Sequence, residues 1–221
     1  MEQNKSRLGY LEGWLSMGVN IILFGLKYWA GLVSGSVALI ADAWHTLSDS
    51  LSSIVVLVGM KISRKPADKE HPFGHGRAEL IASIIIATFL ALIAFNFVTE
   101  SIHKLQSHET ANYGKIAIIV TIISVLMKEG IAQFAFWAGK KVNAPSLKAD
   151  GWHHRTDAIS SIIILIGIFL GKYFWWIDGA LGIIVALMIL YAAYEILKES
   201  AHSLLGEKPS KELIDKLHQI T

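Results

Sequence analysis

The sequence ADAWHTLSDSLSSIVVLVG at residues 41–59 recurs, in altered form, as ADGWHHRTDAISSIIILIG at residues 149–167. Ten of the nineteen positions are identical, and the offset is constant at 108 residues. Each copy begins with the polar head A-D-x-W-H-x-x-x-D and continues into an apolar run. Chance similarity between apolar helices would not reproduce this head, so the chain contains an internal repeat.

The composition around the two copies is that of a membrane protein. Of 221 residues, 53% are hydrophobic and only 17% are charged, whereas soluble domains carry about 25% charged residues. The charges cluster between long apolar stretches, which indicates one integral membrane domain. The net charge of +2 gives no reason to expect nucleic-acid binding. The sequence has no cysteine, which excludes disulfides and thiolate metal ligands.

Six segments are long and apolar enough to cross the ~30 Å hydrocarbon layer, which takes ~20 helical residues. They are Gly13–Val33, Ser36–Met60, Ala78–Thr99, Tyr113–Gly139, Ser146–Gly171 and Phe174–Leu197. The sequence therefore predicts an all-α membrane protein. Its six transmembrane helices would occupy residues 1–200, and residues 201–221 would form a short cytoplasmic tail.

The direction of the helices follows from the charges of their connections. Lysine and arginine concentrate at the N-terminus, in the second and fourth connections and at the C-terminus. The excess of positive charge on cytoplasmic loops predicts a multi-pass protein of the cell membrane with both termini cytoplasmic. The polar N-terminus, residues 1–12, predicts no removable signal peptide.

The two copies of the repeat fall in the second and fifth predicted helices, which must then run antiparallel. This is an inverted three-helix repeat, a pattern of many secondary transporters, in which substrate binds near the midplane where the repeats meet. The alternative is that the duplication simply builds a bundle.

The repeated polar residues have the chemistry of a metal site. His45 and Asp49 are four residues apart, as are His153 and Asp157, which puts each pair on one helix face. Ionisable groups in a membrane cost on the order of 3 kcal/mol each, so they need partners inside the bundle. Two imidazoles and two carboxylates match a tetrahedral zinc site and balance the charge of a divalent ion. One such pair alone would favour a hydrogen bond that locks a helix, but two equivalent pairs favour metal.

Other ionisable residues in these helices are predicted to have lesser roles. Asp42 and Asp150 repeat three residues before each histidine, and a structural role is favoured over ligation. His154 is interpreted as a neighbour of the site that points away from the His153 face. Lys128 and Glu129 are expected to pair locally or to extend toward the membrane surface.

The connection after the second predicted helix, RKPADKEHPFGHGRAE at residues 64–79, contains a second cluster. Asp68, His71 and His75 lie within eight residues, and the two histidines have helical spacing. Spacing alone leaves a shallow metal site and a polar, basic loop equally favoured.

Three motifs together resemble the cation diffusion facilitator family of zinc transporters: HTLSD at 45–49, HHRTD at 153–157 and PADKEHPFGHGRAE at 66–79. The resemblance covers residues 10–210 and implies a homodimer of six-span protomers. It implies two metal sites, a transport site of His45, Asp49, His153 and Asp157 and a loop site of Asp68, His71 and His75. The ligand set implies zinc as the transported substrate, with Co²⁺, Cd²⁺ or Fe²⁺ as further candidates and no cofactor.

One departure concerns the cytoplasmic C-terminal domain that the family usually carries. Only Glu199–Thr221 follow the sixth predicted span, too few residues to bury a core. We therefore expect a bacterial-type member in which this domain is missing.

The resulting hypothesis is zinc/proton antiport that exports metal from the cytoplasm by alternating access. Metal ligation needs neutral imidazole and ionised carboxylate, so protons weaken it, and histidine titrates near pH ~6.5. A passive metal channel, an intramembrane metalloenzyme and a non-transporting assembly partner are the alternatives. An enzyme is disfavoured because four protein ligands leave no open position on the metal and the sequence lacks H-E-x-x-H.

Overall fold

The computed structural model describes residues 2–63 and 65–205, and this part of the chain contains helices and no strand. The helices are α1 (Glu2–Ser34), α2 (Val37–Ser63), α3 (Ala78–Ser107), α4 (Lys115–Lys141), α5 (Pro145–Leu170) and α6 (Ile177–Leu205). The prediction of an all-α protein is confirmed. Residues 206–221, most of the predicted tail at 201–221, lie outside the described residues.

Most of the helices extend beyond the predicted spans. α1 begins at Glu2, well before Gly13, and α6 continues from the predicted end at Leu197 to Leu205. Hydropathy marks only the part of a helix that lies in hydrocarbon, whereas backbone hydrogen bonds continue into polar flanks. A helix of 33 residues, such as α1, is ~50 Å long, against ~30 Å of hydrocarbon.

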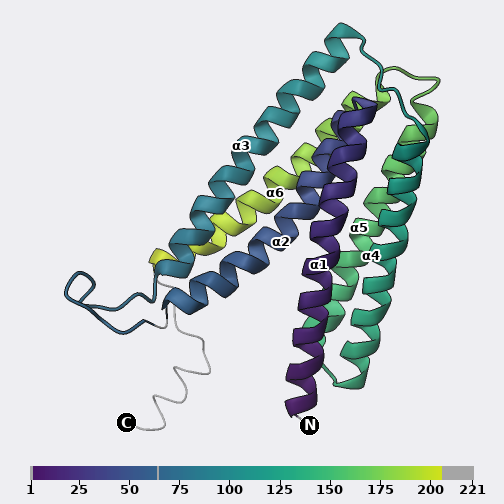
Figure 1. The fold of residues 1–221 in the computed structure, drawn as a ribbon. Coiled ribbons are helices and arrows are strands. Elements are labelled where there is room, and N and C mark those ends of the chain that lie inside the picture. Colours follow the sequence, from purple (N-terminus) through teal and green to yellow (C-terminus); the bar gives the residue numbers. More distant parts are fainter. Residues whose placement is uncertain (1, 64, 206–221) are drawn as a thin grey trace.

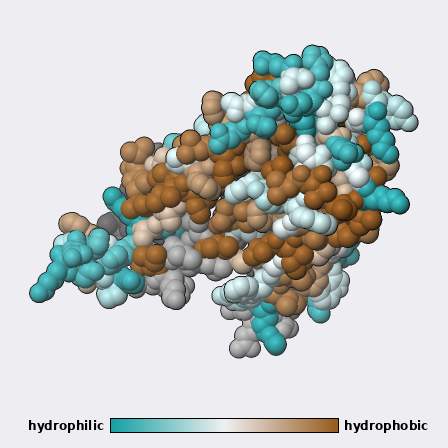
Figure 2. Space-filling model, turned by 45° about the horizontal axis from the view of Figure 1, so that its top comes forward, coloured by the Kyte–Doolittle hydropathy of each residue, from teal (hydrophilic) through white to brown (hydrophobic). Residues whose placement is uncertain are grey.

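The outer surface of the bundle is suited to lipid. Among the described residues, α1, α3, α4, α5 and α6 are long and apolar enough to cross a membrane. The predicted span in α2 includes residues 52, 53 and 55–60, whose side chains lie outside the described part of the structure. Large apolar side chains are exposed on the helices that are long enough to cross a membrane, among them Ile85, Leu92, Leu126 and Leu187. Figure 2 shows the hydrophobic side chains covering the middle of the molecule, with hydrophilic groups gathered toward the ends. Lipid accepts such a surface and water would not, so this is a multi-pass membrane protein.

The helices pack in neighbouring pairs. α3 lies along α6, α4 along α5 and α1 along α2, and α2 also packs against α3 and α6. Figure 1 shows α2 and α5 running in opposite directions, which confirms the predicted antiparallel orientation. The symmetry of the three-helix repeat remains a prediction.

A buried polar network fastens the end of the bundle where α1 turns into α2. Gly35 has a φ of 61°, which permits the tight turn without a Cβ clash. Asp178, at the start of α6, is buried and accepts four hydrogen bonds. The donors are Ser36 Oγ at 2.5 Å, the Val37 backbone N–H at 3.0 Å, Lys104 Nζ at 2.6 Å and the Tyr113 hydroxyl at 2.6 Å. One carboxylate thus ties α2, α3, α6 and the connection before α4 together.

Candidate metal centre

Three of the four residues of the repeated motif, Asp49, His153 and Asp157, come together where α2 and α5 face each other, and His45 lies beside Asp157. His153 Nε2 is 3.6 Å from Asp49 Oδ1 and 3.8 Å from Asp157 Oδ2. His45 Nε2 is 3.7 Å from Asp157 Oδ1. One ligand atom from each of Asp49, His153 and Asp157 lies within 4.8 Å of the other two. The helical spacing within each motif and the antiparallel packing of the two helices produce this convergence.

The separations are close to those that a small cation requires. Metal–ligand bonds of ~2.0–2.2 Å in a tetrahedron put the ligand atoms ~3.3–3.6 Å apart. The three pairs measured here are 3.6–3.8 Å apart, which is close to the spacing of ligand atoms around one ion. Both ring nitrogens of His45 are buried and lack a hydrogen-bond partner among the described residues. Such a nitrogen is costly to bury unless it acquires a partner, and metal ligation would supply one.

A lysine from a third helix enters the same cluster. Lys128 Nζ, on α4, lies 2.7 Å from Asp157 Oδ2 and 3.3 Å from Asp49 Oδ2. The expected local pairing of Lys128 with Glu129 is wrong, because adjacent helical residues do not face each other. Glu129 pairs instead with Arg155, whose Nη2 is 2.7 Å from Glu129 Oε1. A lone lysine within a transmembrane segment requires a carboxylate partner, and this signal was available in the sequence.

A second buried lysine lies on α1. Lys27 Nζ is 2.8 Å from Asp42 Oδ2 and donates to Thr46 Oγ1 at 3.0 Å and Ser161 Oγ at 3.3 Å. These contacts connect α1, α2 and α5 beside the metal-ligand cluster. They fit the structural role that the sequence suggested for Asp42.

A cavity of about 650 Å³ leads to the cluster. Its walls come from α1, α2, α5 and α6, and it includes Asp49 and His153. Gly9 of α1, Ser146 of α5 and Glu199 of α6 line it as well, so it extends toward the end of the bundle where α1 and α5 begin and α6 ends (Figure 1). The side chain of His153 is 52% exposed and that of Asp157 is 6% exposed. His153 therefore lies at the accessible edge of the cluster and Asp157 in its interior.

The cavity wall is acidic. Glu12, Asp150, Glu195 and Glu199 line it, and its described lining contains no lysine or arginine. His154 also lines it and contacts Ser16 Oγ at 3.0 Å and Glu12 Oε1 at 3.4 Å. The prediction that His154 is only a neighbour of the site, pointing away from the His153 face, did not anticipate that His154 lines the cavity. An acidic lining raises the local concentration of cations.

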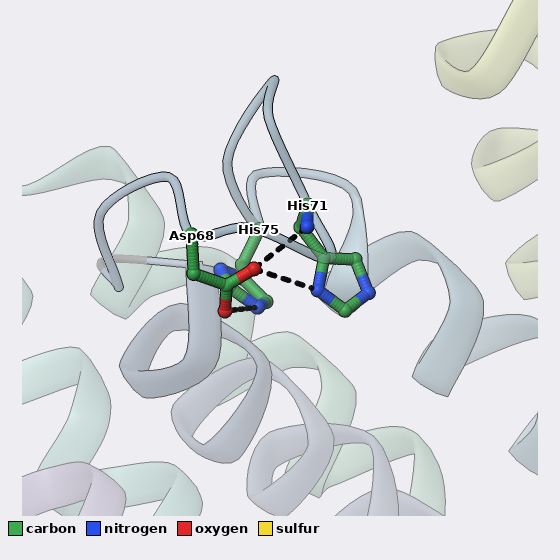
Figure 3. A group of neighbouring side chains, drawn as sticks. All are labelled: Asp68, His71 and His75. Atoms are coloured by element: carbon green, nitrogen blue, oxygen red, sulfur yellow. Dashed lines mark hydrogen bonds and ion pairs between the residues drawn. The ribbon is translucent and has the colours of Figure 1, made fainter.

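The second predicted cluster is assembled in the loop between α2 and α3. Figure 3 shows the Asp68 carboxylate between the two imidazoles. Asp68 Oδ1 is 3.3 Å from His71 Nδ1, and Asp68 Oδ2 is 3.5 Å from His75 Nε2. One ligand atom from each of the three lies within 4.8 Å of the others.

A turn brings the loop residues together, although the spacing of His71 and His75 along the chain is also that of one helix face. α3 begins only at Ala78, because Pro72 and Gly74 interrupt the segment, and Gly74 adopts a φ of 81°. The Asp68 carboxylate accepts the His71 backbone N–H at 2.6 Å. This hydrogen bond, with a smaller contribution from the imidazoles, lowers the pKa of Asp68 below its ordinary value.

Comparison with known proteins gives the family. The family model for the cation efflux transmembrane domain matches residues 13–205. The chain belongs to the cation efflux family. An uncharacterized transporter of Methanocaldococcus jannaschii is 38% identical over 91% of this chain and 73% of its own length. The manganese efflux system protein MneP of Bacillus subtilis is 29% identical over 98% of the chain and 75% of its own length. Metal tolerance protein C1 of Arabidopsis thaliana is 35% identical over 93% of the chain, which spans only 47% of that relative.

Membership of the cation efflux family confirms the resemblance seen in the motifs. The protein is therefore a transporter of divalent metal ions and not an enzyme. The ion is its substrate. Metal binding by the two clusters stays a prediction, as do the coupling ion and the oligomeric state.

Proposed function

We propose that this cation efflux protein is a zinc/proton antiporter whose transport site is formed by His45, Asp49, His153 and Asp157. The observation that carries the proposal is the approach of two imidazoles to two carboxylates, at 3.6–3.8 Å in three imidazole–carboxylate pairs, with both ring nitrogens of the buried His45 lacking a hydrogen bond among the described residues. Two carboxylates balance the charge of one divalent ion, which makes the occupied site tolerable at membrane depth.

The donor set supports zinc as the substrate. Imidazole suits zinc, whereas a site of carboxylates and water would suit manganese. Manganese is nevertheless the second candidate, since MneP of Bacillus subtilis, at 29% identity, is named as a manganese efflux protein. Cobalt, cadmium and iron(II) complete the set of metals to be compared.

Alternating access is supported by the difference between the two ends of the bundle. The cavity reaches Asp49 and His153 from the end where α1 begins, and the Asp178 network fastens the helices at the opposite end. The proposed orientation makes the cavity end cytoplasmic, following the distribution of lysine and arginine. Zinc would enter by the cavity, the bundle would open on the other side, and protons taken up by the histidines would favour release.

The proposal includes a second zinc site at Asp68, His71 and His75 and a homodimer as the transporting unit. The mutual approach of the three loop side chains supports the loop site. Dimerisation rests on the family resemblance, and cross-linking in native membranes tests it.

Transport in proteoliposomes tests the function. The purified chain is reconstituted with a pH-sensitive dye inside, and zinc, manganese, cobalt, cadmium and iron(II) are compared across a range of pH. We expect saturable zinc flux that moves protons in the opposite direction, and loss of both in His45→Ala and Asp157→Ala. His103→Ala, which removes an exposed histidine of α3, is the matched control.

Two results would contradict the proposal. If the single alanine variants of all four residues retain transport, these residues do not form the transport site. Metal flux that is indifferent to the proton gradient, and that does not saturate, would instead identify a passive channel.

A further inference from the structure

Lys128 is the residue that the proposed transport cycle leaves unexplained. Its side chain is 1% exposed and lies in α4, between the two carboxylates of the cluster. The described hydrogen bonds and ion pairs of its ammonium go to Asp49 and Asp157, at 3.3 and 2.7 Å. An ammonium group therefore occupies the place where two proposed metal ligands meet.

Comparison with Lys27 shows that this arrangement is more than ordinary neutralisation of a buried charge. Lys27 is buried to the same degree, but its carboxylate partner is Asp42, and two hydroxyl groups accept its other hydrogen bonds. Lys27 thus has a set of partners outside the metal-ligand cluster. The partners of Lys128 are the groups that a metal would take.

A divalent ion and this ammonium group would compete for the same two carboxylates. A metal ~2.0–2.2 Å from the Asp49 and Asp157 oxygens would lie close to Nζ. Two like charges a few ångströms apart repel strongly where water is largely excluded. We therefore expect metal binding to move the ammonium away from at least one carboxylate.

We propose that Lys128 acts as an internal cation that occupies the metal-free transport site and weakens metal binding by competition. This inference rests on the proposed function, because it takes Asp49 and Asp157 as ligands. The ammonium compensates the two carboxylates while no metal is bound. When metal is bound, it stays nearby as a competing charge, and release is faster than it would be from an uncontested site. Lys128 is a positioning residue that sets affinity and is not itself a ligand.

Metal affinity tests the inference most directly. Zinc and cadmium binding to the purified full chain is measured with metal buffers for the parent and for Lys128→Met. We expect the variant to bind at least about tenfold more tightly, because a repelling charge is removed. Lys128→Arg, which keeps the charge, should remain within about threefold of the parent. The control is Lys27→Met combined with Asp42→Asn, which removes the other buried ion pair and should leave affinity within the same range.

Transport kinetics separate competition from a merely structural role. In Lys128→Met, tighter binding and slower release should lower both KM and kcat for zinc. A structural lesion would lower kcat while KM stayed unchanged or rose. Unchanged or weaker zinc binding by a folded Lys128→Met overturns the inference.

The proposed function fails by a different result. If Asp157→Asn binds zinc as well as the parent does, the transport site itself is wrong. If Asp157→Asn loses binding and Lys128→Met leaves it unchanged, only the role of Lys128 is wrong.

Experimental structures of the unaltered chain with and without zinc keep the inference testable if the Lys128 variants do not fold. We expect Nζ within hydrogen-bond distance of Asp157 without zinc and displaced from at least one carboxylate with zinc bound at His45, Asp49, His153 and Asp157. An Nζ that stays on both carboxylates in the zinc-bound structure overturns the inference.

Discussion

The two metal-ligand clusters use the same side-chain types in opposite surroundings. The Asp157 side chain, in the bundle, is 6% exposed, and the Asp68 side chain, in the loop, is 53% exposed. The buried cluster contains a lysine in contact with both carboxylates. The loop carboxylate is solvent-exposed and contacts two imidazoles and two backbone N–H groups. Burial, and not the identity of the ligands, determines whether a site needs a charged side chain to exist without metal.

This contrast has a consequence for metal exchange. A solvated carboxylate can gain or lose a cation with little change in its electrostatic energy, because water screens the charge. A buried pair of carboxylates cannot be left uncompensated at membrane depth. We therefore expect the loop to tolerate substitution and the bundle to be sensitive to the loss of any charged member.

The largest effect should come from neutralising one carboxylate in each cluster. We expect Asp157→Asn to reduce zinc transport by at least about a hundredfold, because it removes a ligand and leaves Lys128 with less negative charge. Asp68→Asn should leave the rate within about threefold of the parent. The initial rate of zinc flux into proteoliposomes measures the transport of both variants. Equal losses in the two variants would break the distinction between the clusters.

The next effect concerns the structural lysine beside the buried cluster. Lys27→Met leaves the buried Asp42 without its 2.8 Å ion pair, and we expect a loss of stability of about 3–5 kcal/mol. Adding Asp42→Asn should recover most of the loss, because no uncompensated charge remains. Thermal unfolding in detergent measures the stability of the single and the double variant relative to the parent. A single variant as stable as the parent would show that buried charges here need less compensation than we infer.

A smaller effect is expected at the fastened end of the bundle. Tyr113→Phe removes one of four hydrogen bonds to the Asp178 carboxylate, and the other three donors remain. We expect a loss of about 1.5–3 kcal/mol, the range for a hydrogen bond to a charged group. Tyr173→Phe, on an exposed tyrosine, is the matched control for the same denaturation measurement. If both variants unfold together with the parent, the hydroxyl does not stabilise this end.

The smallest effect is the acid response of the loop. The pKa of Asp68 is lowered, first by the His71 backbone N–H. The ionised Asp68 carboxylate therefore stabilises the loop fully at a pH above the ordinary pKa of ~3.9. This stabilisation is lost as the pH falls through the lowered pKa. The carboxyl carbon shift of Asp68 in NMR should titrate below the ordinary value. His71→Ala keeps the backbone donor, so the midpoint should remain low; a return to the ordinary value would assign the shift to the imidazole.

The amino-acid sequence alone determined the helical membrane fold and the proposed ligands. Long apolar segments with no water to satisfy their backbone must form helices, and the repeat of His45 and Asp49 as His153 and Asp157 identifies four ionisable groups that need each other in lipid. The loop cluster was recognisable from its motif. These features depend on spacing along one helix or within one short segment, which the sequence contains directly.

Only the tertiary structure decided which distant groups complete the buried cluster. Lys128 reaches Asp49 and Asp157 because α4 packs along α5, and His154 reaches Glu12 because α5 faces α1 across the cavity. Pro72 and Gly74 likewise set the geometry of the loop by a turn that helical spacing does not describe. Rotation about a helix axis and the choice of neighbour are fixed by side-chain packing over the whole bundle. A pattern read along one helix therefore gives the face of a residue but not the partner that it meets.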